Sequence, residues 1–272
     1  MNDYTRVLEA TERHVQALKA GGVRFLTVES ETLRQLQTAP STKSGQSDKS
    51  DSSDMSDKSA PSSPDNTETA MAALRARASV CVKCPHLAGS RKNVVFGVGD
   101  IHAALMFVGE APGADEDRQG EPFVGAAGQL LTRIIKTMGF SREDVYIANI
   151  LKCRPDTPGQ RAGNRKPTAG EMKTCLPYLL EQIDLIRPKV IVALGATAVE
   201  GLLGKTEPIG KLRGRFQVFR DIPLMPTFHP SYLLRNQALA EKRKVWEDML
   251  QVLEKLNLPV TAKQRGYFLK AG

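Results

Sequence analysis

The chain has 272 residues, 41% of them apolar and 25% charged, and no apolar stretch approaches the roughly 18 residues of a membrane span, so we expect a cytoplasmic protein without a membrane partner. The formal net charge is +8, but residues 1–39 are charge-balanced and residues 40–70 carry six acids and three lysines, which leaves +11 on the remainder. Such a basic core favours a polyanionic partner, nucleic acid above all.

The N-terminal region is predicted to contribute little to the main fold. Residues 4–18 place apolar side chains at helical spacing, and two glycines separate them from a β-like run at 23–28. Residues 1–39 are therefore interpreted as a small α/β element. Residues 40–70 consist mainly of Ser, Asp, Lys and Pro, a composition typical of a disordered linker. We expect residues 1–70 to be where a replication or repair protein would bind.

Strand-like and helical patterns alternate from residue 71 onward. The expected strands are 104–108, 145–148, 190–194 and 223–227, and the expected helices are 126–138, 169–186, 196–203 and 241–256. This alternation predicts a three-layer α/β/α domain over residues 71–260, built on a central, mainly parallel four-stranded sheet. Residues 261–272 are left as a C-terminal tail.

The chain contains four cysteines, Cys81, Cys84, Cys153 and Cys175. A disulfide framework is the alternative to a metal centre, but it is typical of short secreted chains, and the first residues lack the pattern of a secretion signal. One four-thiolate centre uses all four thiols. Thiolate ligands suit zinc and iron–sulfur clusters alike, but two of these cysteines come singly rather than as a second C-x-x-C pair, which favours a [4Fe-4S] cluster.

Polar residues follow the predicted strands at their carboxyl ends, where open parallel sheets bind ligands. Glu110 follows the first strand within Gly109-Glu-Ala-Pro-Gly113, Asn149 follows the second, and His229 follows the fourth. Asparagine at a strand end is more often a turn former, and a single histidine there is as often structural as functional. Their convergence on one edge of the sheet nevertheless predicts a site.

Together these motifs resemble those of the family-4 (type a) uracil-DNA glycosylases, which carry a [4Fe-4S] cluster. The resemblance covers about residues 74–257. It rests on Cys81-x-x-Cys84, Gly109 to Gly113 with Glu116-Asp117, residues 120–131, Asn149 with Lys-Cys153-Arg-Pro, Cys175, and His229-Pro-Ser231. Only the segment 156–168 looks longer than is common in the family. The resemblance implies a monofunctional enzyme of base excision repair that flips uracil out of single- or double-stranded DNA and hydrolyses its N-glycosidic bond.

The resemblance also implies individual roles. Phe123 would stack on the flipped base, and the Asn149 amide would accept a hydrogen bond from uracil N3–H and donate one to O4. His229 would donate to uracil O2 as negative charge forms there, and Glu110 would orient the attacking water. The uracil pocket would be formed by Gly109, Ala111, Glu116, Phe123, Asn149 and His229. In the wider superfamily an acid or Asn often stands where this chain has Ala111, so this chain departs from that pattern at the position next to Glu110.

Other residues are predicted to contact DNA. Leu233 matches the place where such enzymes push an apolar side chain into the gap left by the flipped base, although ordinary packing is the alternative. Ser231 matches a phosphate contact. Further phosphate contacts are expected from the cations Arg161, Arg165, Lys166, Lys211, Arg213 and Arg215, which could equally form a solvated basic face.

Three rival functions stay open at this point. A related subgroup captures uracil-DNA covalently through a histidine in a basic loop, but the segment 210–216 contains no histidine, which argues against it. A non-enzymatic nucleic-acid-binding module and an electron-transfer protein are the other two. We expect a monomer.

Overall fold

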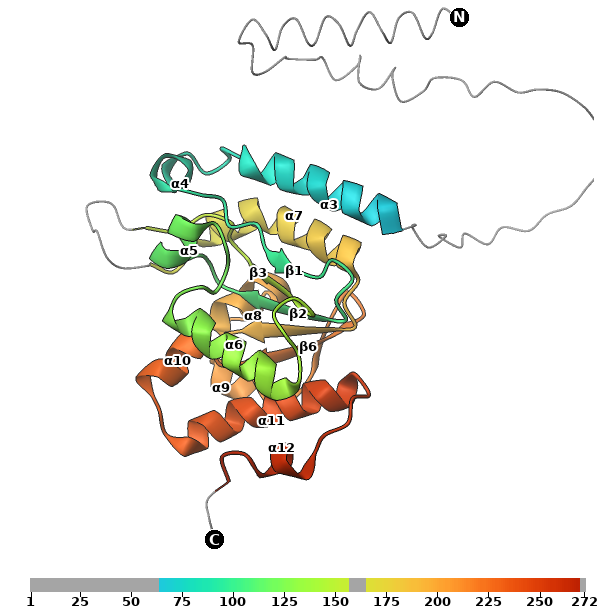
Figure 1. The fold of residues 1–272 in the computed structure, drawn as a ribbon. Helices are drawn as coiled ribbons and strands as arrows, with labels where there is room; N and C mark the ends of the chain where they lie inside the picture. Colours follow the sequence, from blue (N-terminus) through green and yellow to red (C-terminus); the bar gives the residue numbers. More distant parts are fainter. Residues whose placement is uncertain (1–63, 157–164, 270–272) are drawn as a thin grey trace, which may run out of the picture. The chain divides into compact units, whose positions relative to one another are not determined.

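The computed structural model describes residues 64–156 and 165–269 (Figure 1). The predicted N-terminal element, most of the predicted linker and Arg161 lie outside these residues. The sheet contains β1 (Val98–Gly99), β2 (Leu105–Gly109), β3 (Tyr146–Asn149), β4 (Val190–Leu194), β5 (Gln217–Phe219) and β6 (Ile222–Thr227). The helices are α3 (Pro64–Ser79), α4 (Pro85–Ser90), α5 (Ala114–Gln119), α6 (Ala126–Met138), α7 (Ala169–Ile186), α8 (Ala196–Leu203), α9 (Ile209–Leu212), α10 (Pro230–Arg235), α11 (Leu239–Lys255) and α12 (Ala262–Gly266). None of these helices is long and apolar enough to cross a bilayer.

The strands are ordered β1-β3-β2-β4-β6-β5. The four predicted strands are β3, β2, β4 and β6, and they pair in parallel as expected. The predicted count of four is wrong, because β1 and β5 add short antiparallel edges of two and three residues. Strands this short show too little alternation to be recognised in a sequence.

The two faces of the sheet are covered by different helices, which gives the predicted three layers (Figure 1). Because successive strand residues point to opposite faces, Met106 and Val108 pack with α3, α7 and α8, whereas Leu105 and Phe107 pack with α6 and α11. All five residues of β2 and of β4 are buried, as expected for strands inside a parallel sheet.

Two predicted boundaries need correction. Helix α3 begins at Pro64, so the last residues of the predicted linker are helical and α3 packs on α7. The predicted C-terminal tail contains α12, which starts with a capping box between Thr261 and Gln264 and receives the indole N–H of Trp246 at the Gln264 carbonyl.

Candidate active site

The carboxyl ends of β2 and β3 bring Gly109 and Asn149 side by side as register partners. A β-carbon at residue 109 would lie 2.4 Å from Asn149 Oδ1 and 2.5 Å from Phe123 Cζ. Glycine is therefore required here so that the amide of Asn149 and the ring of Phe123 can approach each other. Gly109, Asn149 and Phe123 therefore lie together at the carboxyl end of the sheet.

Asn149 is 2% exposed, yet its Oδ1 atom has no hydrogen-bond partner. Among the buried side-chain nitrogen and oxygen atoms of residues 64–156 and 165–269, it is the one atom without a partner. Leaving a buried acceptor unpaired costs about 1–3 kcal/mol, so such atoms are rare outside binding sites. Asn149 thus presents a hydrogen-bond acceptor beside an aromatic ring, the pair of features that an N–H-bearing planar base would use.

A buried lysine, Lys152, holds the backbone of Asn149, a role that the motif containing it did not predict. Lys152 is 2% exposed, and its Nζ donates to the Asn149 carbonyl at 3.0 Å and to Gln182 Oε1 at 2.6 Å. Gln182 in turn donates from Nε2 to the Tyr146 hydroxyl at 2.9 Å. Burial lowers the pKa of Lys152 to about 7. These contacts hold the end of β3 in place.

Phe123 stands in the left-handed backbone region, with φ of 55°, which is unusual for an aromatic residue. Its carbonyl lies so close to helix α6 that a β-carbon at Gly128 would be 1.8 Å from it. Glu116 holds the following residues: its Oε1 accepts from the backbone N–H groups of Val124 and Gly125, both at 3.0 Å. Its Oε2 accepts from the Gly113 N–H at 3.0 Å. In this structure the Glu116 carboxylate therefore orders the loop that carries Phe123.

His229 completes the site from the end of β6. Its ring centroid lies 5.6 Å from that of Phe123. The backbone at His229 lies close to Gly195, which has a φ of +93°, and a β-carbon at residue 195 would be 3.0 Å from His229 Cβ. The backbone N–H of Ser231 donates to Nδ1 at 3.2 Å, so the ring proton belongs on Nε2. Burial, with a contribution from Arg235, lowers the pKa of His229 to about 4 against the opposing effect of Glu116. His229 is thus a neutral donor at physiological pH.

Glu110 follows Gly109 and is half-buried at the same strand end. Its carboxylate forms no hydrogen bond or ion pair with the described part of the chain, whereas its carbonyl accepts from the Leu151 N–H at 3.1 Å. Ala111, next in sequence, packs against the core cluster on the side of α3 and α7.

The four cysteines are free thiols that pack against that same core, so the disulfide alternative is not observed. Burial and the nearby Cys153 raise the pKa of Cys84, and burial raises the pKa of Cys175 to about 11, with Cys153 and Cys81 acting in the same direction. The thiols are therefore close enough to influence one another's ionisation. No group of three or more His, Cys, Asp or Glu side chains in residues 64–156 and 165–269 is arranged to hold a single metal ion.

Two N–H groups point at these sulfur atoms. Arg91 Nη1 donates to Cys153 Sγ and the backbone N–H of Lys152 donates to Cys175 Sγ, both at 3.2 Å. Hydrogen bonds of this kind stabilise thiolates and tune metal–thiolate centres. The donor set and its polar surroundings suit a thiolate-bound centre, since a bound cation would replace the thiol protons that burial retains.

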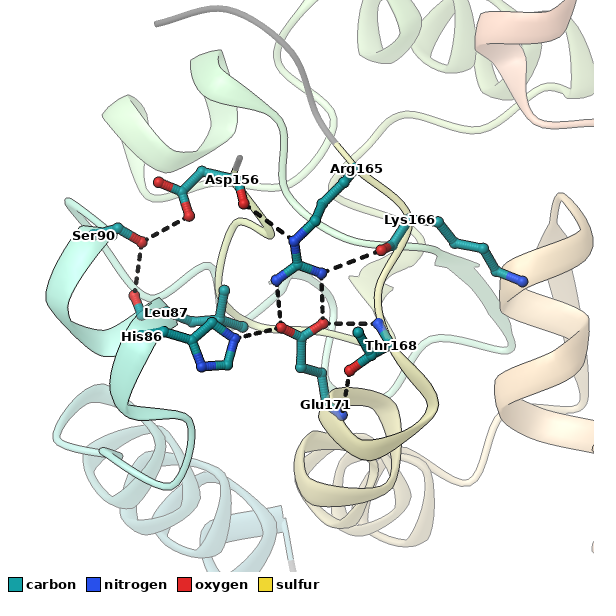
Figure 2. Close-up of polar contacts among 8 residues, drawn as sticks. All are labelled: His86, Leu87, Ser90, Asp156, Arg165, Lys166, Thr168 and Glu171. Carbon is teal, nitrogen blue, oxygen red and sulfur yellow. Dashed lines mark hydrogen bonds and ion pairs between the residues drawn. The ribbon is translucent and has the colours of Figure 1, made fainter. Parts of the chain in front are cut away.

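The Glu171 carboxylate joins α4 to the segment that precedes α7 (Figure 2). Its carboxylate accepts from both terminal nitrogens of Arg165, at 2.8 and 2.5 Å, from His86 Nε2 at 2.6 Å and from the Thr168 N–H at 2.7 Å. The hydrogen bond from Arg165 lowers the pKa of Glu171 to about 2. His86 lies in α4 just after Cys84, and Glu171 precedes Cys175 in α7, so one carboxylate joins both parts of the cysteine set.

Comparison with known proteins places this geometry in a family. The model of the uracil DNA glycosylase superfamily matches residues 96–250. The chain belongs to this superfamily. It is 47% identical over 182 residues to the type-4 uracil-DNA glycosylase of Thermotoga maritima, covering 66% of this chain and 91% of the relative. It is 44% identical over 191 residues to the type-4 enzyme of Saccharolobus solfataricus, covering 66% and 84%. The type-5 enzyme of Pyrobaculum aerophilum is 31% identical over 189 residues, covering 57% and 80%.

Several residues predicted to contact DNA pack against or bind other residues of the protein in this structure. Leu233 is 5% exposed and packed in α10, so it is not available to enter DNA as placed here, and the packing alternative fits. Both the hydroxyl and the N–H of Ser231 contact His229 Nδ1. The phosphate contact of Ser231 stays a prediction, and the burial of Leu233 depends on the packing of a six-residue helix, which a sequence does not show.

The predicted cations divide in the same way. Arg213 forms a two-point ion pair with Asp248, with distances of 2.6 and 3.0 Å to the two carboxylate oxygens, and Asp248 also accepts from Thr227 Oγ1. Arg165 is bound to Glu171, and Lys166 pairs with Glu200 at 2.5 Å. Lys211 and Arg215 are exposed and make no ion pair within the described ranges.

Proposed function

We propose that this chain excises uracil from DNA in the manner of the type-4 uracil-DNA glycosylases, flipping the nucleotide into the site and leaving an abasic sugar. Membership of the superfamily and 47% identity to the type-4 enzyme of Thermotoga maritima support the activity. The observation that carries it to the residues is the unpaired, buried Oδ1 of Asn149 beside the Phe123 ring.

In this proposal the base is read by Asn149 and held by Phe123. Uracil offers an N3–H donor to Oδ1 and an O4 acceptor to the amide nitrogen, so both groups of the side chain are satisfied. Cytosine presents the reverse pattern and would leave buried polar groups unpaired, which is the strongest form of rejection available to a binding site. Stacking on Phe123 adds about 1–3 kcal/mol without choosing among bases.

Bond cleavage places cationic character on the sugar and negative charge on uracil O2. The Nε2–H of neutral His229 is the proposed donor to that oxygen, since its Nδ1 is held as an acceptor by Ser231. Glu110 is the proposed group that orients water toward the sugar, because its carboxylate has no other engagement in the described residues. Lys211 and Arg215 are the proposed phosphate contacts, whereas we propose a structural role for Arg213.

We also propose that Cys81, Cys84, Cys153 and Cys175 hold a [4Fe-4S] cluster. The support is the set of four free thiols, the raised pKa values of Cys84, Cys153 and Cys175, to which the neighbouring thiols contribute, and the N–H groups of Arg91 and Lys152 at two of the sulfur atoms. Bound there, the cluster would cross-link the segments around it. Cys153 lies four residues after Asn149, so this cross-link would stabilise the end of β3 that carries the base-reading amide. In this proposal the cluster is structural and takes no part in the chemistry.

Activity is tested with matched oligonucleotides containing one uracil, thymine or cytosine, scored for alkali-labile sites. We expect cleavage at uracil, and we expect Asn149→Asp to excise uracil more slowly and to discriminate less against cytosine. If the protein binds the DNA but produces no alkali-labile sites, the binding-module alternative is favoured. A protein–DNA complex that resists denaturant would favour covalent capture. The cluster is tested by measuring iron and acid-labile sulfide in the purified protein. Zinc without sulfide would mean that the cysteines hold zinc instead of a cluster.

A further inference from the structure

Arg142 lies outside every motif that the sequence suggested, in the loop between α6 and β3, yet its side chain reaches the Phe123 turn. Nη2 donates to the Pro122 carbonyl at 2.9 Å and Nη1 donates to the Phe123 carbonyl at 3.2 Å. Nη1 also donates to Thr132 Oγ1 at 3.1 Å, and that hydroxyl donates to the Gly128 carbonyl at 3.0 Å. Two consecutive carbonyls are thus bound by one guanidinium.

We infer that Arg142 is a positioning residue that holds Phe123 in its left-handed conformation as the platform for the base. This inference rests on the proposed function, because it concerns the same site. Glu116 takes the backbone N–H groups after Phe123, and Arg142 takes the carbonyls at and before it, so the peptide groups on both sides of the ring are fixed. A left-handed Phe persists only where its surroundings determine it.

The geometry requires arginine rather than any cation. Three separate acceptors are reached from two nitrogens of one rigid, planar fork, whereas a lysine places all its donors on one atom. Arg142 is half-buried, and the phosphate-contact alternative would leave its N–H groups facing solvent rather than two backbone carbonyls. Arg142→Lys therefore keeps the charge and removes the fork.

A double-mutant cycle tests the inference with four proteins: wild type, Arg142→Lys, Phe123→Leu and the double variant. Single-turnover uracil excision is measured below the melting temperature of each. We expect Arg142→Lys to slow excision roughly tenfold when Phe123 is present and less than about twofold when it is leucine, because the arginine acts through the ring. Arg133→Lys, at an exposed site on α6, is the matched control and should leave the rate unchanged.

An equal loss in both backgrounds would overturn the inference, since Arg142 would then act on stability or on DNA independently of Phe123. The same four proteins are also compared for affinity to uracil- and thymine-containing oligonucleotides. If the wild type released no uracil, the proposed function would fail, but a preference for uracil that Arg142→Lys lowers only in the Phe123 background would still support the platform role. Equal lowering in both backgrounds would reject it.

Discussion

Gly109 and Asn149 are partners across β2 and β3, and the missing side chain of the first leaves room for the amide of the second. A β-carbon at residue 109 would stand 2.4 Å from Asn149 Oδ1, well inside van der Waals contact. The same carbon would meet the Phe123 ring at 2.5 Å. One glycine therefore sets the separation between the proposed base-reading group and the proposed stacking platform.

Gly109→Ala should accordingly damage the site more than the fold. Residue 109 does not have a positive φ, so alanine fits its backbone, and the clash is with two side chains that must move. Displacement of a positioning group by about 1 Å costs on the order of 100-fold in rate. We expect a loss of that size in uracil excision, measured beside Gly266→Ala, where a β-carbon would meet nothing within 4 Å. A variant at 109 that cleaves normally would show that Asn149 and Phe123 adapt.

The sheet and its main helices could be predicted because their signals are local. The bounds of α6, α7, α8 and β4 agree with the prediction, since alternation and helical spacing persist over whole elements there. The placement of Asn149 and His229 at the same edge of the sheet was also predictable, because the carboxyl ends of parallel strands share one edge. The partners of Arg142 and Lys152 were not, since they bind backbone carbonyls, which leave no mark in a sequence. The burial of Leu233 and the pairing of Arg213 depend on helix packing that only the fold reveals.

Glu171→Gln should weaken retention of the proposed cluster. The carboxylate binds Arg165 and His86 from two different segments, and the neutral amide would lose the negative charge that pairs with Arg165. Changes in the groups around metal ligands cost about 10–100-fold in metal affinity. We expect faster release of the metal to a chelator, followed by loss of absorbance. Glu181→Gln, at an exposed carboxylate of the same helix, is the control. Equal release rates for both variants would mean that Glu171 does not support the centre.

Arg213→Met and Arg215→Met should separate stability from DNA affinity. The Asp248 carboxylate is fully buried, so loss of Arg213 leaves it without its cationic partner, a change that costs about 3–5 kcal/mol in the free energy of unfolding. Arg215 is exposed, and its loss should leave stability within about 0.5 kcal/mol while lowering the salt dependence of DNA binding by about one ion. Urea denaturation and salt titrations measure the two effects. Weakened DNA binding by a stable Arg213 variant would restore the phosphate-contact prediction.

His229 should make the free energy of unfolding sensitive to acid. Burial lowers its folded-state pKa to about 4, whereas an unfolded histidine titrates near 6.5. Between these values the unfolded chain binds the extra proton, so the contribution of neutral His229 is complete above about pH 6.5 and is lost as the pH falls toward 4. By linkage the loss is on the order of 3 kcal/mol. His229→Gln cannot be protonated, so the free energy of unfolding of this variant should fall less over that range.

The difference between wild type and His229→Gln is the measured quantity, because acid effects on the rest of the molecule cancel in it. His102→Gln is the matched control, since His102 is exposed on a surface turn. Excision by the wild type should show no inflection near pH 6.5 from this residue, because the Nε2 donor is already present in the neutral ring. An inflection there that disappears in His229→Gln would mean that burial does not keep the ring neutral, and a rate that rises as the pH falls through it would mean that the imidazolium form is the active one.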